Sequence, residues 1–189
     1  MKLIVTRHGE TEENKLGILQ GHMPGTLSKE GVQQAKKLAL RLKDEKIDLI
    51  YSSDLKRAKD TTKEIIKFHK NTPVFYIKEL REGDNGSYEG KKRTEVDLNH
   101  FPEDAESLEN MMKRIGGFLD KLYQENKDKT ILFICHGGIK RSLIAHILNK
   151  PVSYIKEVPK PENTAVSIFE IREDKNHKMH LLNCIKHLE

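Results

Sequence analysis

Short apolar runs alternate with longer segments of helical periodicity along the chain. The run Thr130–Cys135 is almost wholly apolar, which is typical of a strand buried on both faces. In 28–43 the apolar residues recur on one helical face, and Ser28 stands where a helix cap is expected. We predict strands over 2–6, 48–51, 74–77, 130–135, 166–171 and 179–185, and helices over 28–43, 54–68, 108–123 and 138–149.

This alternation of strands and helices indicates an α/β fold, a three-layer α/β/α sandwich with a mostly parallel central sheet. No internal repeat or linker interrupts the pattern, so we predict one domain over 1–189. The segment 83–107 is polar, contains glycines and follows neither period well. It is long for a connection and is interpreted as a functional loop or lid.

The composition favours a water-soluble protein with an anionic partner. Of 189 residues, 36% are hydrophobic and 33% charged, and the formal net charge is +5. No apolar run approaches the roughly 18 residues of a membrane span, and the N-terminal run is too short for a signal peptide. We therefore expect a cytoplasmic location and no membrane contact. The positive charge fits a phosphorylated metabolite or a nucleic acid; without a nucleic-acid motif, the metabolite is preferred.

Two histidines follow the predicted strands where ligands of such folds bind, beyond the carboxyl ends of the strands. His8 comes directly after the first strand, between Arg7 and Gly9. His136 follows the most apolar strand, and the next residue, Gly137, opens a helix whose free N–H groups suit a phosphate. Taken singly, each motif also fits an ordinary loop or a structural histidine.

Two further strand ends add charged groups to the same rim. Arg57 lies just past the strand 48–51 and has a planar guanidinium that matches phosphate oxygens. Glu82 follows the strand 74–77 and is a carboxylate among basic groups, so it is a candidate proton donor to a leaving group. The convergence of His, Arg, His, Arg and Glu is much more specific than any one motif.

The set of motifs resembles the histidine phosphatase superfamily, the phosphoglycerate mutase-like enzymes. The resemblance extends from Lys2 to about Phe169. It is carried by Arg7-His8-Gly9-Glu10-Thr11 with Asn14, Leu19-Gln20-Gly21, Leu27 to Ala35, Ser52 to Ala58 with Thr61, Leu80-Arg81-Glu82 with Gly86 to Gly90, Cys135-His136-Gly137-Gly138, and Asn163-Thr164.

The resemblance implies phosphoryl transfer without a metal or cofactor. His8 would attack phosphorus, and Arg7, Arg57 and His136 would hold the phosphoryl oxygens. Glu82 would protonate the leaving oxygen. The remaining implied phosphate- or substrate-binding residues are Asn14, Gln20, Gly21 and Gly137.

Within the family, the short interval between Glu82 and His136 favours a phosphatase over a phosphoglycerate mutase. The segment 83–107 favours a covered pocket for a small metabolite over the open site of a protein phosphohistidine phosphatase. Both alternatives stay open at this point. The sequence carries no signal for an oligomeric state.

The sequence departs from the family pattern in three places. Cys135 stands where serine is usual, 23–26 lacks the usual acid, and Thr164 stands where cysteine or serine is common. We expect Cys135 to be a buried core thiol. His22 fits either a substrate contact or an exposed side chain, and the basic group 91–93 either an anion contact or a solvated turn. The spacing of His177, His180 and His187 matches no standard metal site.

Overall fold

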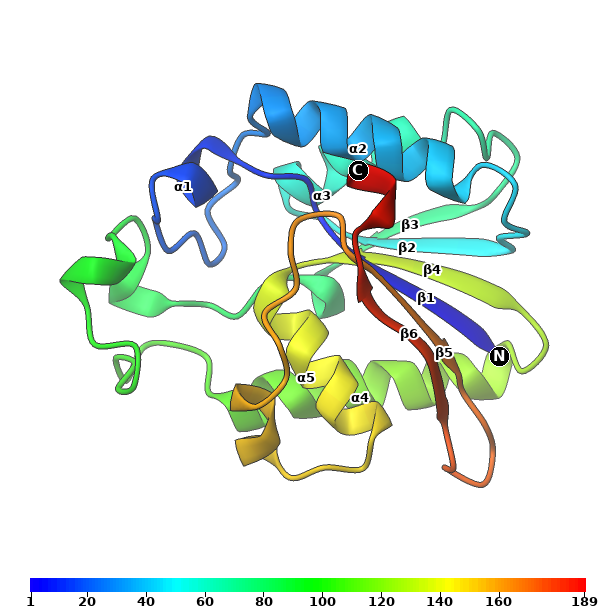
Figure 1. Ribbon diagram of the computed structural model, residues 1–189. Coiled ribbons are helices and arrows are strands. Elements are labelled where there is room, and N and C mark those ends of the chain that lie inside the picture. Colours follow the sequence, from blue (N-terminus) through cyan, green and yellow to red (C-terminus); the bar gives the residue numbers. More distant parts are fainter.

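A computed structural model describes all residues, 1–189, and contains a six-stranded sheet between two layers of helices (Figure 1). The strand order is β3-β2-β4-β1-β5-β6. The first four of these are mutually parallel, whereas β5 is antiparallel to both β1 and β6. The predicted three-layer α/β/α fold with a mostly parallel sheet is confirmed. The strands are β1 (Lys2–Arg7), β2 (Leu49–Ser53), β3 (Val74–Ile77), β4 (Thr130–Cys135), β5 (Val166–Glu170) and β6 (Lys178–Cys184).

Five α-helices accompany the sheet. α2 and α3 cover one face and α4 and α5 the other (Figure 1). The helices are α1 (Glu12–Lys15), α2 (Lys29–Leu42), α3 (Lys56–Ile65), α4 (Leu108–Glu125) and α5 (Gly137–Ile147). The four long ones match the predicted helices to within a few residues at each end. No helix is both long and apolar enough to cross a membrane.

The core is divided between the two faces by the alternation of side chains along the central strands. In β1, Leu3 and Val5 pack with α4 and α5, whereas Ile4 packs with α2 and α3. All three side chains are fully buried. Because β1 and β4 are central and buried on both faces, packing fixes their positions. The residues that directly follow these strands are therefore also held in place.

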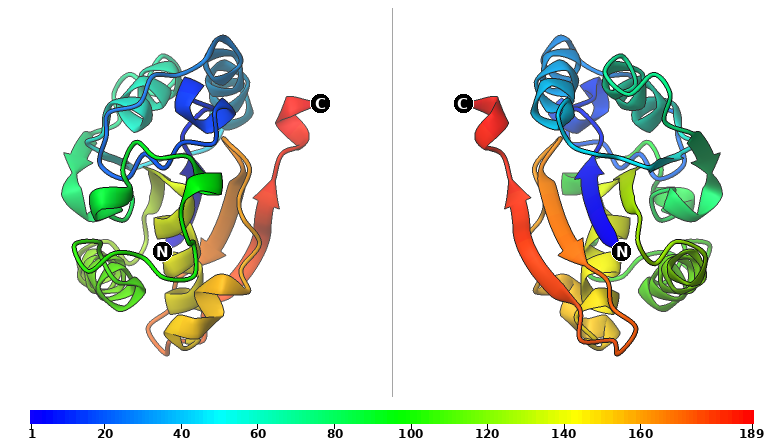
Figure 2. Two further views of the ribbon diagram at one scale, coloured as in Figure 1. Left: turned by 90° about the vertical axis from the view of Figure 1, so that its left-hand side faces the viewer. Right: turned by 90° about the vertical axis from the view of Figure 1, so that its right-hand side faces the viewer.

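The carboxyl ends of the parallel strands meet at one edge of the sheet, where α1 and the segment 83–107 also lie (Figure 1; the left view of Figure 2 faces this edge). The segment 83–107 contains two short 3₁₀ helices, Gly86–Tyr88 and Arg93–Glu95, and no strand or α-helix. Its placement over this edge is what a lid requires, and that role stays a prediction.

Candidate active site

The two candidate histidines leave adjacent strands in register. Arg7 pairs with Cys135 in the parallel ladder of β1 and β4, and the N–H of His8 donates to the Cys135 carbonyl at 3.0 Å. His8 and His136 are therefore the next residues of two paired strands, and their ring centroids lie 5.1 Å apart. Both rings are buried. The sequence placed both histidines at strand ends, and the strand order makes those ends neighbours.

His8 is held as a neutral imidazole with a defined tautomer. Its Nδ1 lies 2.7 Å from the Gly9 carbonyl oxygen. Because a carbonyl only accepts, Nδ1 carries the proton and Nε2 carries the lone pair. Burial lowers the pKa of His8 well below its ordinary value of 6.5, and the Arg57 and Arg7 charges lower it further. His8 thus presents a neutral nitrogen base at Nε2.

Arg7 is buried and incompletely satisfied. Its Nη1 donates to the Pro161 carbonyl at 2.9 Å, but its Nε is buried without a hydrogen-bond partner. Burial lowers the pKa of Arg7 from its ordinary value, while the carboxylates of Glu82 and Glu162 oppose that shift. A buried guanidinium N–H without an acceptor is costly. An anion bound beside His8 would supply the missing acceptor.

Arg57 is 1% exposed and lies in the first turn of α3. Its Nε donates to His136 Nδ1 at 3.1 Å, its Nη2 donates to the Gly21 carbonyl at 2.8 Å, and its Nη1 donates to the Met23 carbonyl. Burial is the main reason that the pKa of Arg57 falls to about 10. This arginine therefore connects the second histidine to the loop that contains Gly21.

His136 is held at both ring nitrogens. Because a guanidinium only donates, His136 Nδ1 accepts from Arg57, and Nε2 therefore carries the proton that it donates to Ser53 Oγ at 2.8 Å. Burial lowers the pKa of His136 well below 6.5, and the charge of Arg57 contributes next. The family resemblance implies that His136 holds a phosphoryl oxygen. To donate a hydrogen bond to that oxygen from Nδ1, the ring would have to carry a proton on Nδ1, which here accepts from Arg57.

Glu82 occupies the N-terminus of α5. Its Oε2 accepts from Gly138 N–H at 3.0 Å, and its Oε1 accepts from Ile139 N–H at 3.0 Å and from Gly83 N–H at 3.1 Å. An added Cβ at Gly137 would lie 3.8 Å from Arg7 Nε and 3.9 Å from Glu82 Oε2, so Gly137 is next to both groups. The Glu82 carboxylate accepts hydrogen bonds from the N–H groups of the two residues that follow Gly137. Gly137 itself is not part of this contact and faces the site.

Asn14 reaches the site from α1, which the sequence pattern missed because four residues are too few to show helical periodicity. The Asn14 Oδ1 accepts from Thr11 N–H and from Asn163 Nδ2, both at 3.3 Å. Asn163 Nδ2 also donates to the His8 carbonyl at 2.9 Å. With its oxygen engaged, Asn14 has its amide nitrogen available as a donor, as its expected role requires.

Gln20 and Gly21 belong to a loop that pairs with residues 90–93 of the segment 83–107. Gln20 is buried, and its Oε1 has no hydrogen-bond partner. Gly21 has φ +46°, and an added Cβ would lie 1.9 Å from Glu89 Oε1, so only glycine fits there. Backbone hydrogen bonds between 17–19 and 90–93, including an isolated bridge from Ile18 to Lys92, join the two segments.

Several other sequence expectations also have an outcome. Cys135 is a buried free thiol, as expected, and burial raises its pKa to about 12. His22 is half-buried, and its Nε2 donates to the Glu82 carbonyl at 2.9 Å, so it contacts the backbone of the candidate acid. The side chains of 91–93 are exposed. No group of three or more His, Cys, Asp or Glu side chains has the arrangement of a metal site.

The sequence interpretation assigned no role to several residues that fix the site. Ser53 binds His136, and Glu89 Oε1 accepts the His22 N–H at 2.6 Å. Thr61 Oγ1 accepts the Gly9 N–H at 3.0 Å, which ties α3 to the residue after His8. Ser53 and Thr61 lie in the same sequence motif as Arg57. Their closeness to Arg57 in the sequence is the one feature from which a role in the site could have been predicted.

Comparison with known proteins gives the class that this fold and site define. The profile of the histidine phosphatase superfamily (branch 1) matches residues 3–184, so the chain belongs to that superfamily. It is 30% identical to the metal-independent phosphoserine phosphatase of Arabidopsis thaliana over 190 residues, covering 92% of this chain and 78% of that one.

Two solved structures agree with this assignment. Phosphoserine phosphatase from Entamoeba histolytica, in complex with 3-phosphoglyceric acid, superposes with a TM-score of 0.89 at 30% identity, covering 100% of this chain and 99% of that chain. The α-ribazole phosphatase of Shigella flexneri gives a TM-score of 0.88 at 27% identity, with 97% and 96% covered.

Proposed function

We propose that this protein is a metal-independent phosphatase that hydrolyses phosphate monoesters of small metabolites through a phosphohistidine on His8. The observation that carries the proposal is the state of His8. Its ring is buried and neutral, its Nδ1–H is bound to the Gly9 carbonyl, and its Nε2 carries a lone pair, while the charges of the buried Arg7 and Arg57 act on the ring. A neutral ring nitrogen with a free lone pair is what an in-line attack on a phosphate requires.

In the first step, the Nε2 lone pair of His8 forms a bond to phosphorus as the ester P–O bond breaks. Negative charge on the phosphoryl oxygens is stabilised by Arg7, whose buried Nε needs an acceptor, and by Arg57. Asn14 and the Gly137 N–H are further donors. Glu82 donates a proton to the leaving oxygen, so the alcohol departs neutral.

In the second step, water attacks the phosphorus of the phosphohistidine. Glu82, now a carboxylate, takes a proton from the water as the P–N bond breaks. Inorganic phosphate and neutral His8 are released, and Glu82 is protonated again. No net proton or electron is left over, and neither step needs a metal ion.

The substrate class follows from the covering of the site and from the relatives. The 17–25 loop and the segment 83–107 lie together over the strand ends, which favours a small substrate over a phosphorylated protein (Figure 2). The named relatives act on phosphoserine and α-ribazole phosphate, and one binds 3-phosphoglyceric acid. Phosphoserine and 3-phosphoglycerate are therefore the first substrates to assay. Phosphoglycerate mutase activity is the second candidate.

The test compares the wild type with His8→Asn on phosphoserine, p-nitrophenyl phosphate and a phosphohistidine-containing protein. We expect turnover of the small esters by the wild type and only background turnover by the variant, with an unchanged thermal unfolding curve. Substantial activity of His8→Asn would reject the nucleophile. Isomerisation of 3-phosphoglycerate exceeding its hydrolysis would favour the mutase, and preference for the phosphoprotein would favour a protein phosphatase.

A further inference from the structure

Arg114, on α4, forms a bidentate ion pair with Glu106, the residue before the last of the segment 83–107. Its Nε donates to Glu106 Oε1 at 2.8 Å and its Nη2 donates to Glu106 Oε2 at 2.6 Å. The side chains of Arg114 and Glu106 are 23% and 17% exposed, so the pair is largely shielded from water. A planar guanidinium fixes a carboxylate in both distance and direction.

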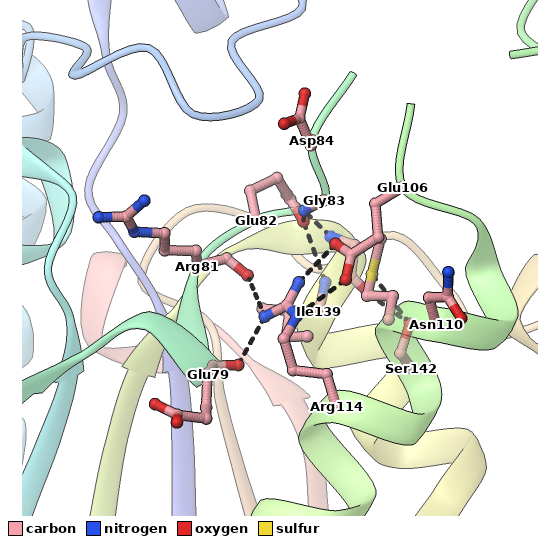
Figure 3. Close-up of polar contacts among 12 residues, drawn as sticks. Glu79, Arg81, Glu82, Gly83, Asp84, Glu106, Asn110, Arg114, Ile139 and Ser142 are labelled. Atoms are coloured by element: carbon pink, nitrogen blue, oxygen red, sulfur yellow. Dashed lines mark hydrogen bonds and ion pairs between the residues drawn. The ribbon is translucent and has the colours of Figure 1, made fainter. Parts of the chain in front are cut away.

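The third nitrogen of the same guanidinium binds the residues that precede Glu82. Arg114 Nη1 donates to the Glu79 carbonyl at 2.7 Å and to the Arg81 carbonyl at 3.2 Å. Figure 3 shows both carbonyls converging on Arg114, while Glu82 points away toward α5. One side chain thus ties the backbone just before Glu82 to the distal end of the segment 83–107.

The two ends of that segment also contact each other and α4. Glu106 N–H donates to the Asp84 carbonyl at 2.9 Å. Gly83 lies against α4, because an added Cβ there would meet Met111 Cε at 2.3 Å. Along the chain, Glu82 therefore lies between residues whose carbonyls bind Arg114 and a glycine that packs against α4. Its carboxylate reaches the N-terminus of α5.

We propose that Arg114 is a positioning residue for the general acid: it fixes the peptide 79–82 so that the Glu82 carboxylate is seated beside the leaving oxygen. The inference rests on the proposed function, because it assumes the acid role of Glu82. Arg114 touches neither the phosphoryl group nor the histidines. It acts by restricting the backbone from which the acid projects.

Proton transfer tolerates only a small displacement of the acid from the leaving oxygen. A misplacement of about 1 Å costs on the order of 10²-fold in rate. Without Arg114, the carbonyls of Glu79 and Arg81 lose a charged donor and Glu106 loses its partner, so both ends of the segment become free to shift. Lysine at this position supplies one point charge and cannot bind the carboxylate and both carbonyls together.

The test uses Arg114→Lys and Arg114→Met, with Lys113→Met as the matched control on the same helix. Lys113 is exposed, and we expect its variant to behave like the wild type. Both Arg114 variants should slow phosphoenzyme formation from phosphoserine, the methionine variant by about 10²-fold. The loss on p-nitrophenyl phosphate, whose leaving group needs little protonation, should be clearly smaller. KM should change little, because no substrate contact is removed.

A double-mutant cycle with Glu82→Gln separates positioning from a general structural effect. If Arg114 acts through Glu82, the Arg114→Met substitution should cause no further loss on phosphoserine when the acid is already absent. Multiplicative losses in the cycle would overturn the proposal while leaving the acid role of Glu82 intact. A Glu82→Gln enzyme with equal losses on both substrates would instead refute the acid itself. Should circular dichroism show Arg114→Met unfolded, Arg114→Lys, which keeps a charge beside Glu106, replaces it in the cycle.

Discussion

The seat of Glu82 on α5 can be disturbed without changing the acid itself, by replacing Gly138 with alanine. A Cβ at this position would lie 2.6 Å from Glu82 Oε1, and ordinary contact begins at 3.4 Å. The carboxylate oxygen must therefore move by about 0.8 Å. Because the obstacle is the end of a flexible side chain, the backbone of α5 does not have to move. The acid should leave the N–H groups of Gly138 and Ile139.

The expected consequence is a selective loss of proton donation. A shift of this size is worth about 10²-fold in rate for a step that depends on the acid. Stability should change by less than about 2 kcal/mol, because alanine gains helix propensity while one or two hydrogen bonds are lost. Gly117→Ala is the matched control: it lies within α4, and an added Cβ there meets nothing within 4 Å.

The assay is single-turnover formation of the phosphoenzyme from phosphoserine and from p-nitrophenyl phosphate. For Gly138→Ala we expect about 10²-fold loss on phosphoserine and a much smaller loss on the nitrophenyl ester. Gly117→Ala should match the wild type on both. Equal losses on the two esters, or no loss on either, would refute the reasoning that Glu82 acts from its seat on α5.

Three further predictions concern the acid, a buried lysine and metal independence. Glu82→Gln should slow phosphoenzyme formation from phosphoserine by about 10²–10⁴-fold, less on p-nitrophenyl phosphate, and should let phosphohistidine accumulate; equal losses would exclude the acid role. Lys140 is fully buried with one hydrogen bond, to the Ala165 carbonyl at 2.8 Å, and burial lowers its pKa from 10.5 to about 7. At a pH between these two pKa values, the Lys140 amine binds a proton in the unfolded chain but not in the folded protein, so the free energy of unfolding should rise with pH by about 1.4 kcal/mol per pH unit. Lys140→Met should remove that slope in denaturant titrations. An unchanged slope would contradict the lowered pKa of Lys140. Vanadate should inhibit the enzyme and EDTA should not; activity lost in EDTA and restored by Mg²⁺ would contradict metal independence.

The strands and their ends could be predicted from sequence because their signals are local. The run Thr130–Cys135 is apolar throughout, and it forms β4 with the predicted bounds. Ser28 caps α2 as expected, accepting the Gly31 N–H at 2.9 Å. Once β1 and β4 are neighbours, His8 and His136 must emerge side by side, so the pairing of the histidines follows from the fold.

The connections that orient the side chains could not be predicted because they join segments far apart in the chain. Arg57 binds carbonyls of the loop around Gly21. Every residue has a backbone carbonyl, so the residue types do not show which carbonyl an arginine will bind. Arg114 contacts carbonyls more than thirty residues earlier, at Glu79 and Arg81. Such contacts depend on how loops lie over a finished sheet, whereas hydrophobic periodicity reports only local structure.

The most direct test of the central claim is the site of covalent phosphorylation. The Glu82→Gln enzyme is mixed with excess p-nitrophenyl phosphate, whose leaving group needs little protonation, quenched in alkali and examined by intact-protein and peptide mass spectrometry. The account predicts one added phosphoryl group on the peptide that contains His8, lost on acid treatment and absent from the Glu82→Gln/His8→Asn double variant. A phosphoryl group on any other residue, or hydrolysis at the full rate by His8→Asn, would contradict it.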